Sequence, residues 1–270
     1  MTTTDFNRLS SFIQNEYGIK MPPAKKIMLE CRLRKRLGAL NMASYKEYCD
    51  FVFGKAGGQQ EIVHMIDAIT TNKTDFFREF PHFDFLTNHA LPELYSNACK
   101  ELRIWSAGCS SGEEVYTLAT VLNEYTSGTN KPGYHILGTD VSTRMLSTAV
   151  TAIYSEERVS DIPLALRRKY FLKSKDRHKK TVRVVPEIRA RVRFESLNLM
   201  DEIYNVQNDY DIIFCRNVLI YFDKLTQEQV VNKLSSKLKK GGFLFLGHSE
   251  SVLNMQHPLT QVKPTILRKN

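Results

Sequence analysis

From residue 101 onward, short apolar runs alternate with longer amphipathic stretches, and this alternation constrains the fold more than any other feature. The runs ELRIWSAG, YHILGTD, YDIIFCRN and GGFLFLGHS have the composition of buried strands. The stretches EEVYTLATVLNEY, STRMLSTAVTAIY and LTQEQVVNKLSSKL carry apolar residues at helical spacing. Regular alternation of strands and helices predicts an α/β domain with a doubly wound, mostly parallel, Rossmann-like sheet.

The first hundred residues show no alternation typical of strands. Their apolar residues recur at helical spacing, which predicts amphipathic helices. The sequence therefore indicates an N-terminal helical domain over residues 1–70, a linker over 71–90 and the α/β domain over 91–270. The periodic residues include Phe6, Leu9, Phe12 and Ile13, and later Ile62, Met65, Ile66 and Ile69.

Residues 154–195 interrupt the alternation of strands and helices. This segment contains TVRVVPEI and ARVRFESL, which are basic and have strand-like composition. We therefore expect a small antiparallel β-subdomain inserted in the α/β domain.

Composition excludes several classes of protein. An apolar content of 42% suits a globular core, and no run approaches the roughly 18 apolar residues of a membrane span. The start MTTTDFNRLS lacks the pattern of a signal peptide. The 5 cysteines include no C-x-x-C pair, and the 7 histidines lack metal-ligand spacing. These features predict a cytoplasmic protein with reduced thiols, no metal and no direct membrane insertion. We expect a monomer, because no coiled-coil pattern or exposed apolar stripe argues against one.

A formal net charge of +9 implies an acidic partner, either nucleic acid or an acidic protein surface. The excess gathers in a helix at about residues 24–38 and in the stretch 167–193. Alternatively, either cluster is a charged surface that is exposed to solvent and binds no partner.

The turn after the first predicted strand, Gly108-Cys109-Ser110-Ser111-Gly112, matches the G-x-S-x-G pattern of a nucleophilic serine. A hydrolase triad needs an acid and then a histidine downstream, and Asp140 or Asp211 followed by His248 would supply them. In hydrolases, however, several strands precede this turn, and a loop after one of them supplies a backbone N–H to the oxyanion hole. In this sequence only predicted helices precede the turn. A serine hydrolase is therefore a remote alternative.

The same turn suits a cofactor site. Gly108 and Gly112 would let a ligand approach the backbone, and Asp140, at the end of the second strand, could bind ribose hydroxyls. Glu113 and Glu114 follow the turn, where carboxylates would repel the phosphates of a dinucleotide. A cationic ligand without phosphates, such as S-adenosylmethionine, fits better. One of the two glutamates could merely complement the helix dipole.

Five sequence blocks resemble, in order, the chemotaxis receptor methyltransferases of the CheR type. They are AITTNKTDFFRE (68–79), WSAGCSSGEEVY (105–116), LGTDVS (137–142), LNLMD (197–201) and CRNVLIYFD (215–223). The only departures are Gly108 and Ser111, where alanine and threonine are also familiar. The resemblance implies an S-adenosylmethionine methyltransferase sheet with an N-terminal helical domain and an inserted β-subdomain. It also implies transfer of methyl groups to glutamate carboxylates of chemoreceptors, which gives glutamate methyl esters and S-adenosylhomocysteine in chemotactic adaptation.

The resemblance also implies roles for individual residues. Glu113 and Asp140 would hold the methionine amino group and the ribose, and Asn198 and Leu199 would flank the adenine. Arg78 and Tyr221 would be catalytic, facing the methyl group and the incoming carboxylate. The cofactor-binding set is Asn72, Thr74, Arg78, Gly108, Glu113, Asp140, Asn198, Leu199, Arg216 and Asn217.

The expected partner is the cytoplasmic helical bundle of a chemoreceptor. We expect charge steering by the basic helix to bring it in, through the substrate-binding residues Arg32, Arg34, Lys35 and Arg36. In some family members the β-subdomain also docks a C-terminal receptor peptide as an added strand. Because the loop KSKDRHKK is charged rather than glycine-rich, this docking stays open here. We expect no nucleic-acid partner, because few aromatic residues accompany the basic stretch. The alternative, motivated by the net charge, is a methyltransferase that acts on RNA or on another acidic partner.

Overall fold

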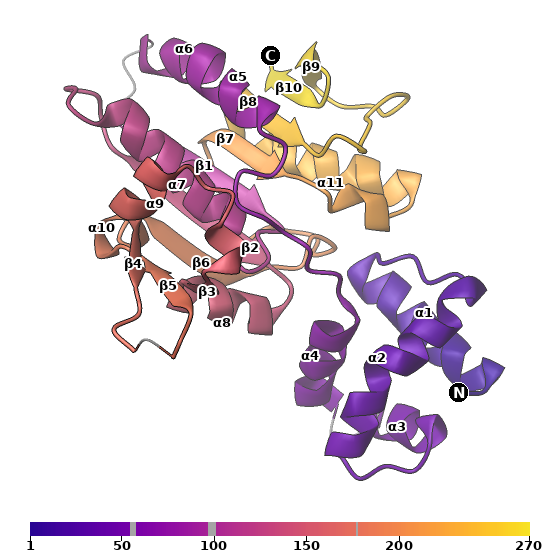
Figure 1. Ribbon diagram of the computed structural model, residues 1–270. Coiled ribbons are helices and arrows are strands. Elements are labelled where there is room, and N and C mark those ends of the chain that lie inside the picture. The colour runs from indigo at the N-terminus through magenta and orange to yellow at the C-terminus, as the bar shows by residue number, and fades with distance from the viewer. Residues whose placement is uncertain (55–57, 97–100, 177) are drawn as a thin grey trace.

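The computed structural model describes residues 1–54, 58–96, 101–176 and 178–270, and it shows a helical domain beside an α/β domain (Figure 1). A capping box between Thr2 and Asp5 begins the first helix, and Gly18 ends it in the left-handed conformation. The apolar faces of the helices meet in one core, which includes Leu9, Leu33 and Met65. The helices are α1 (Thr3–Tyr17), α2 (Lys26–Ala39), α3 (Tyr45–Val52) and α4 (Gly58–Ile69), with a short turn η1 (Pro23–Lys25) before α2. The predicted N-terminal helical domain is confirmed.

Three consecutive helical segments connect the linker to the sheet and pack on one of its faces. Phe83 stacks on Phe214, and Phe85 lies against Phe243 and Phe245. These segments are α5 (Pro81–Phe85), the π-helical η2 (Leu86–Ala90) and α6 (Leu91–Ser96).

The main sheet has seven strands in the order β6-β2-β1-β7-β8-β10-β9. The five strands from β6 to β8 are parallel, and β10 pairs antiparallel with β8 and β9. The predicted doubly wound, mostly parallel sheet is therefore confirmed. The strands are β1 (Leu102–Ala107), β2 (Tyr134–Asp140), β6 (Val192–Ser196), β7 (Tyr210–Cys215), β8 (Leu238–Leu246), β9 (Leu259–Lys263) and β10 (Ile266–Lys269).

Alternate residues of the central strands serve opposite faces of the sheet. Ile104 and Ile212 join the core under α5 and α7, whereas Trp105 and Ile213 join the core under α11. The chain leaves β1 toward β2 on one side and returns to β7 on the other. This reversal creates a crevice at the carboxyl ends of the strands, where ligands bind in open α/β sheets. The crossover helices are α7 (Glu113–Thr126), α8 (Thr143–Thr151) and α11 (Lys224–Lys237).

The predicted insert forms a small antiparallel sheet in the order β3-β5-β4, with β3 (Ile153–Ser155), β4 (Phe171–Lys173) and β5 (Thr181–Val184). Placing ARVRFESL in this insert is wrong, because its residues form β6 and pair in parallel with β2. An alternating basic strand has the same pattern at the edge of either sheet, so the pattern could not name the partner. The remaining elements of this region are η3 (Glu157–Val159), α9 (Leu164–Tyr170) and α10 (Pro186–Arg189).

Other expectations differ in detail. The helix predicted over STRMLSTAVTAIY ends at Thr151, and the antiparallel hairpin β9–β10 was not predicted. Cys31, Cys49, Cys109 and Cys215 are free thiols, while Cys99 lies outside the described residues. Across the described part of the chain, no helix is long and apolar enough to cross a membrane.

Candidate active site

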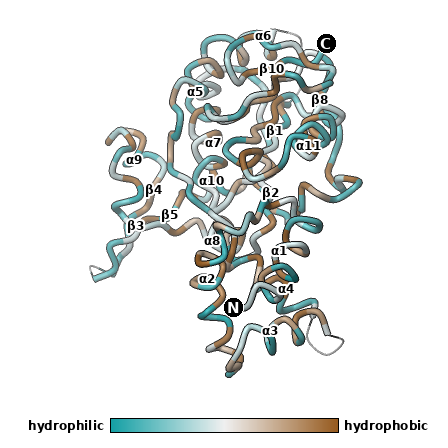
Figure 2. Tube along the Cα trace, turned by 90° about the vertical axis from the view of Figure 1, so that its right-hand side faces the viewer, coloured by the Kyte–Doolittle hydropathy of each residue, from teal (hydrophilic) through white to brown (hydrophobic). Residues whose placement is uncertain are grey.

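A cavity of about 280 Å³ lies at the carboxyl ends of the central strands, and the helical domain covers it. Figure 2 shows the helical domain directly against the sheet at this end of the molecule. Three parts of the chain supply most of its lining: residues 17–32, which include Arg32, the linker at 69–78, and the loops that follow the strands. Phe83 of α5 completes it. The loop residues are Gly108, Ser110, Glu114, Asp140, Val141, Leu197, Asn198, Leu199, Arg216, Asn217, Val218, Ile220, Tyr221 and Phe222.

Hydrogen bonds join the two domains around this cavity. The backbone N–H of Lys20 donates to the carbonyl oxygen of Tyr221 at 2.9 Å, and Asn198 Nδ2 donates to the carbonyl oxygen of Glu16 at 2.7 Å. Gly18 makes the approach possible, since a Cβ there would lie 2.6 Å from Met200 Sδ. The end of α1 is therefore part of the cavity wall.

The two glycines of the turn have different tasks. Gly108 has φ of +87°, and a Cβ on it would lie 2.4 Å from Val218 Cγ2 inside the cavity wall. Gly112 has φ of +93° and instead lets α7 begin against Ala149, 2.9 Å from the position of a Cβ. Gly108 thus shapes the cavity, and Gly112 packs the helix.

The serine hydrolase alternative is wrong, because its triad is not assembled. Ser110 Oγ donates to the carbonyl oxygen of Asn72 at 3.1 Å. Asp211 lies at the amino end of β7, where it binds the backbone N–H of Arg103 and Lys239 Nζ. Asp140 accepts from backbone N–H groups, and the described residues hold no histidine between it and the serine.

Asp140 ties the glycine turn to the end of β2. Its carboxylate accepts from the backbone N–H groups of Ser110 at 2.8 Å and Ser142 at 2.9 Å. Burial raises the pKa of Asp140, and these amide hydrogen bonds oppose the shift. The carboxylate lines the cavity and keeps acceptor capacity for hydroxyl groups of a ligand.

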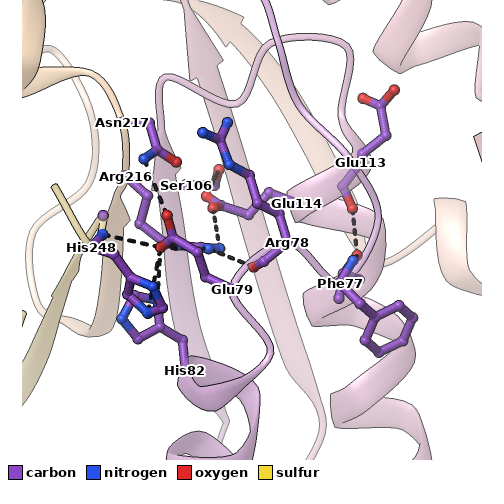
Figure 3. A network of polar contacts seen from close by, with 12 residues as sticks. Phe77, Arg78, Glu79, His82, Ser106, Glu113, Glu114, Arg216, Asn217 and His248 are labelled. Atoms are coloured by element: carbon purple, nitrogen blue, oxygen red, sulfur yellow. Dashed lines mark hydrogen bonds and ion pairs between the residues drawn. The ribbon is translucent and has the colours of Figure 1, made fainter. Parts of the chain in front are cut away.

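The two glutamates that follow the turn point in different directions. Glu113 is buried, pairs with Arg158 and accepts from Ser111 Oγ, and it does not line this cavity. Glu114 lines the cavity, accepts from Ser106 Oγ at 2.8 Å and pairs with Arg216 at 2.9 Å. Figure 3 shows Glu114 beside Arg216 and Glu113 apart from them. Of the two glutamates, the structure thus places Glu114, and not the expected Glu113, in the lining of this cavity.

Arg216 is the centre of a polar network at the base of the cavity (Figure 3). Its side chain is 2% exposed and pairs with both Glu79, at 3.0 Å, and Glu114. Asn217 Nδ2 also donates to Glu79, at 3.2 Å. Burial alone would raise the pKa of Glu79, but the charge and hydrogen bonds of Arg216 lower it overall. The sequence interpretation missed Glu79, although it directly follows Arg78 in the block that carries the resemblance.

Arg78 lies in a strained segment at the rim of this network. The residues on both sides of it, Phe77 and Glu79, have φ of +54° and +58°, a conformation that non-glycine residues adopt only at a cost. Its guanidinium donates to the carbonyl oxygen of Lys73 at 2.8 Å and has no carboxylate partner among the described residues. The strained backbone thus presents an unneutralised guanidinium to the cavity.

The basic residues of α2 separate into two kinds. Arg36 pairs with buried Glu61 at 2.6 Å, and Arg32 donates to the carbonyl oxygen of Ile69 and to Thr71 Oγ1. Arg36 therefore joins α2 to α4 inside the helical domain, and Arg32 joins α2 to the start of the linker. Arg34 and Lys35 are exposed.

His82, His248 and Glu79 bring their ligand atoms within 4.8 Å of one another. Nε2 of buried His82 lies 2.9 Å from Thr265 Oγ1. Its Nδ1 has no hydrogen-bond partner among the described residues and lies 3.5 Å from Glu79 Oε2. A metal ion would face the guanidinium of Arg216, which already pairs with the same Glu79 oxygen. We therefore assign no metal to this cluster.

The burial of His82 predicts a pH-dependent stability. Burial, followed by the charge of Arg216, lowers the pKa of His82 to about 4, against about 6.5 in an unfolded chain. The unfolded chain then binds the proton more readily, so stability is full above about pH 6.5 and falls as the pH drops toward 4. Between pH 7.5 and pH 5 we expect His82 to account for a loss of about 2 kcal/mol.

Urea denaturation of the wild type and of His82→Gln at both pH values measures this loss. Exposed His64, changed to glutamine, is the control. An equal loss of stability in the wild type and in His82→Gln would show that another group titrates.

Comparison with known proteins agrees with this geometry. Residues 4–70 match the CheR methyltransferase all-alpha domain, and residues 72–267 match the CheR methyltransferase SAM binding domain. The chain belongs to the CheR methyltransferase family.

Relatives match over almost the whole chain. A chemotaxis protein methyltransferase of Borreliella burgdorferi is 39% identical and covers 100% of this chain and 95% of its own. Chemotaxis protein methyltransferase 2 of Pseudomonas aeruginosa is 35% identical, over 98% of this chain and 92% of its own. The Escherichia coli chemotaxis protein methyltransferase is 34% identical, over 96% and 88%.

The cavity of this CheR methyltransferase suits S-adenosylmethionine, the cofactor of the family. It offers the carboxylates of Asp140 and Glu114 for hydroxyl and ammonium groups, and the side chains of Leu197 and Leu199 for an aromatic base. Gly108 leaves open the space that a Cβ would fill. Nine of the ten residues expected at the cofactor line this cavity, namely Asn72, Thr74, Arg78, Gly108, Asp140, Asn198, Leu199, Arg216 and Asn217.

Proposed function

We propose that this CheR methyltransferase methylates glutamate side chains in the cytoplasmic domain of a chemoreceptor, giving glutamate methyl esters. One observation carries the proposal: the unpaired guanidinium of Arg78 lies at the rim of a cavity whose other charged side chains include carboxylates suited to a cationic cofactor. A guanidinium in this place fits an incoming carboxylate. The relatives named as chemotaxis protein methyltransferases support the same substrate class.

The chemistry needs little beyond positioning. A glutamate carboxylate has an ordinary pKa of about 4.3 and is already ionised near neutral pH, so no general base is required. S-adenosylmethionine, when bound, supplies a methyl group on a positively charged sulfur. Holding the carboxylate in line with that methyl group can contribute up to roughly 7–11 kcal/mol.

Arg78 and Tyr221 are the residues that we propose to face the reacting groups. Arg78 can hold a carboxylate through two parallel N–H groups, a geometry that lysine cannot copy. This grip must weaken during transfer, because the carboxylate loses its charge as the ester forms. Tyr221 lines the cavity from the turn η4 (Leu219–Tyr221), where its hydroxyl can orient the acceptor.

Cofactor binding is divided among four parts of the chain in this proposal. Glu114 and Asp140 bind the ammonium group and the ribose, and Asn198 and Leu199 bind the adenine. Asn72 and Thr74 line the cavity on the side of the linker. Arg216 acts through Glu114, whose carboxylate it holds at 2.9 Å.

Exposed Arg34 and Lys35 are the basic residues of α2 that we propose for the approach of an acidic receptor bundle. Arg32 and Arg36 are left out of this surface, because both are committed to contacts inside the helical domain and the linker. Docking of a receptor peptide on the β-subdomain stays a proposal, and Arg177 of its charged loop lies outside the described residues.

Transfer of a radiolabelled methyl group to a chemoreceptor cytoplasmic fragment tests the proposed substrate. We expect base-labile label on the fragment, and no label when its acceptor glutamates are changed to alanine. Label that remains after those changes, or that appears on added RNA instead, would refute the proposal and favour the RNA alternative.

Glu114→Gln is expected to weaken binding of S-adenosylhomocysteine by about 10- to 100-fold, the value of a charge-assisted hydrogen bond. Glu113→Gln is the matched control, because it also removes one ion pair with an arginine but lies outside the cavity. We expect its affinity to stay near that of the wild type in titration calorimetry. The reverse order of the two variants would return the ligand role to Glu113.

A further inference from the structure

Glu250 is a buried carboxylate at the carboxyl end of β8, and its role is not explained by the site described above. It is 6% exposed and has no ion-pair partner in the described part of the chain. A buried charge without a counter-ion is costly unless hydrogen bonds replace its water.

Backbone amides supply those hydrogen bonds. One carboxylate oxygen accepts from the N–H groups of Val218 at 2.8 Å and Leu219 at 2.7 Å. The other accepts from the N–H groups of Asn217 at 2.9 Å and of Gly247. Burial raises the pKa of Glu250, and these four amides oppose the shift. Three consecutive amides of the loop after β7 are therefore held by one side chain.

The loop after β7 depends on this anchor for its conformation. Asn217 has φ of +59°, so its backbone is in the left-handed region. A Cβ on Gly247 would lie 2.6 Å from Asn217 Nδ2 and 2.7 Å from Asn217 N, so only glycine permits this approach. The amide bonds to Glu250 accordingly stabilise a left-handed backbone at Asn217, a conformation that few non-glycine residues adopt.

The same loop forms one wall of the cofactor cavity. Asn217, Val218 and Tyr221 line that cavity, and Val218 packs directly against Gly108. A shift of the backbone at residues 217–219 would move all of these groups together.

We propose that Glu250 is a positioning residue for methyl transfer, which fixes the backbone of Asn217, Val218 and Leu219 so that the cavity wall stays aligned. Its carboxylate touches neither cofactor nor substrate and acts only through the loop. This inference depends on the proposed function in one respect: its kinetic assay uses a receptor fragment as the methyl acceptor.

Glutamine is the informative replacement, because it keeps the shape and removes the charge. A carboxylate accepts at both oxygens, whereas an amide places N–H donors against two of the four backbone donors. We expect Glu250→Gln to lower kcat by about 10²-fold, the scale of a small misplacement of reacting groups. We expect the dissociation constant of S-adenosylhomocysteine to rise by only about fivefold, since other parts of the cavity remain intact.

Glu228→Gln is the matched control, since in the described part of the chain that carboxylate accepts only from the backbone N–H of Gln256, outside the cavity. In Gly247→Ala, the added methyl group would displace the same loop while the charge of Glu250 remains. We again expect kcat to fall more than the affinity for S-adenosylhomocysteine. Assays run far below the unfolding transition separate misplacement from a smaller folded fraction.

Amide hydrogen exchange gives a readout that needs no acceptor. The amides of residues 217–219 should exchange at least about tenfold faster in Glu250→Gln, while Glu228→Gln leaves them unchanged. Unchanged exchange, or wild-type kcat in Glu250→Gln, would overturn the inference. If the wild type itself methylates no receptor fragment, the proposed substrate fails, and the exchange rates alone decide the role of Glu250.

Discussion

Replacing Arg78 by alanine is expected to lower kcat for methyl transfer by about 10²- to 10³-fold, the usual loss when one charged group at a reacting centre is removed. Arg78 lines the cavity, and among the described residues its guanidinium donates only to a backbone carbonyl oxygen, that of Lys73. Its loss therefore leaves no buried carboxylate unpaired, and the fold should persist. Binding of S-adenosylhomocysteine should remain measurable, because the carboxylates at the cofactor are untouched.

Kinetics on a receptor fragment, with calorimetry on the same preparations, measure both quantities. Arg78→Lys keeps the charge but loses the planar fork, so we expect it to fall between alanine and the wild type. Arg103→Ala removes an exposed guanidinium near the opposite end of β1 and should leave turnover unchanged. Near-normal turnover of Arg78→Ala would exclude a role of this guanidinium in catalysis.

The fold was predictable where hydrophobic pattern alone decides it. Runs such as YDIIFCRN are buried on both faces, and a parallel sheet covered by helices is the arrangement that accommodates them. The edge strands were harder, because Val192–Ser196 alternates in the same way whether it pairs with β2 or with the insert. The hairpin β9–β10 carries several exposed polar residues and gave no buried-strand signal.

The sequence predicted most of the residues that line the candidate site, but not which way each side chain points. Adjacent residues such as Glu113 and Glu114 differ by about 100° around a helix, so only one of them can face the cavity. The sequence interpretation preferred Glu113, whereas the start of α7 at Gly112 places Glu114 there. The partner of Glu113, Arg158, comes from the inserted region, and no local pattern could reveal that pairing.

The groups that the sequence interpretation missed act on backbone or on other side chains. Glu79 binds Arg216, and Glu250 binds loop amides that lie about thirty positions earlier in the chain. Such long-range contacts have no periodicity, so they become visible only when the carboxyl ends of β7 and β8 are brought together. For the same reason, the exposed and committed arginines of α2 could not be separated beforehand.

Replacing Arg216 by methionine is expected to destabilise the protein by about 3–5 kcal/mol, the cost of leaving a buried ion pair without one partner. Arg216 is almost fully buried and pairs with both Glu79 and Glu114, which are themselves 13% and 14% exposed. Without the guanidinium, two carboxylates would remain close together in a poorly solvated site. A loss of this size is a large part of the stability of a typical domain, about 5–15 kcal/mol.

Urea denaturation of Arg216→Met, with and without the added changes Glu79→Gln and Glu114→Gln, tests the electrostatic origin of this loss. If uncompensated charge is the cause, the triple variant should recover more than half of the lost stability, although it removes more polar groups than the single one. Arg8→Met provides the contrast, because the Arg8–Asp50 pair is exposed and should be worth at most about 1 kcal/mol. A triple variant less stable than Arg216→Met would mean that the shape and hydrogen bonds of Arg216, rather than its charge, hold the base of the cavity together.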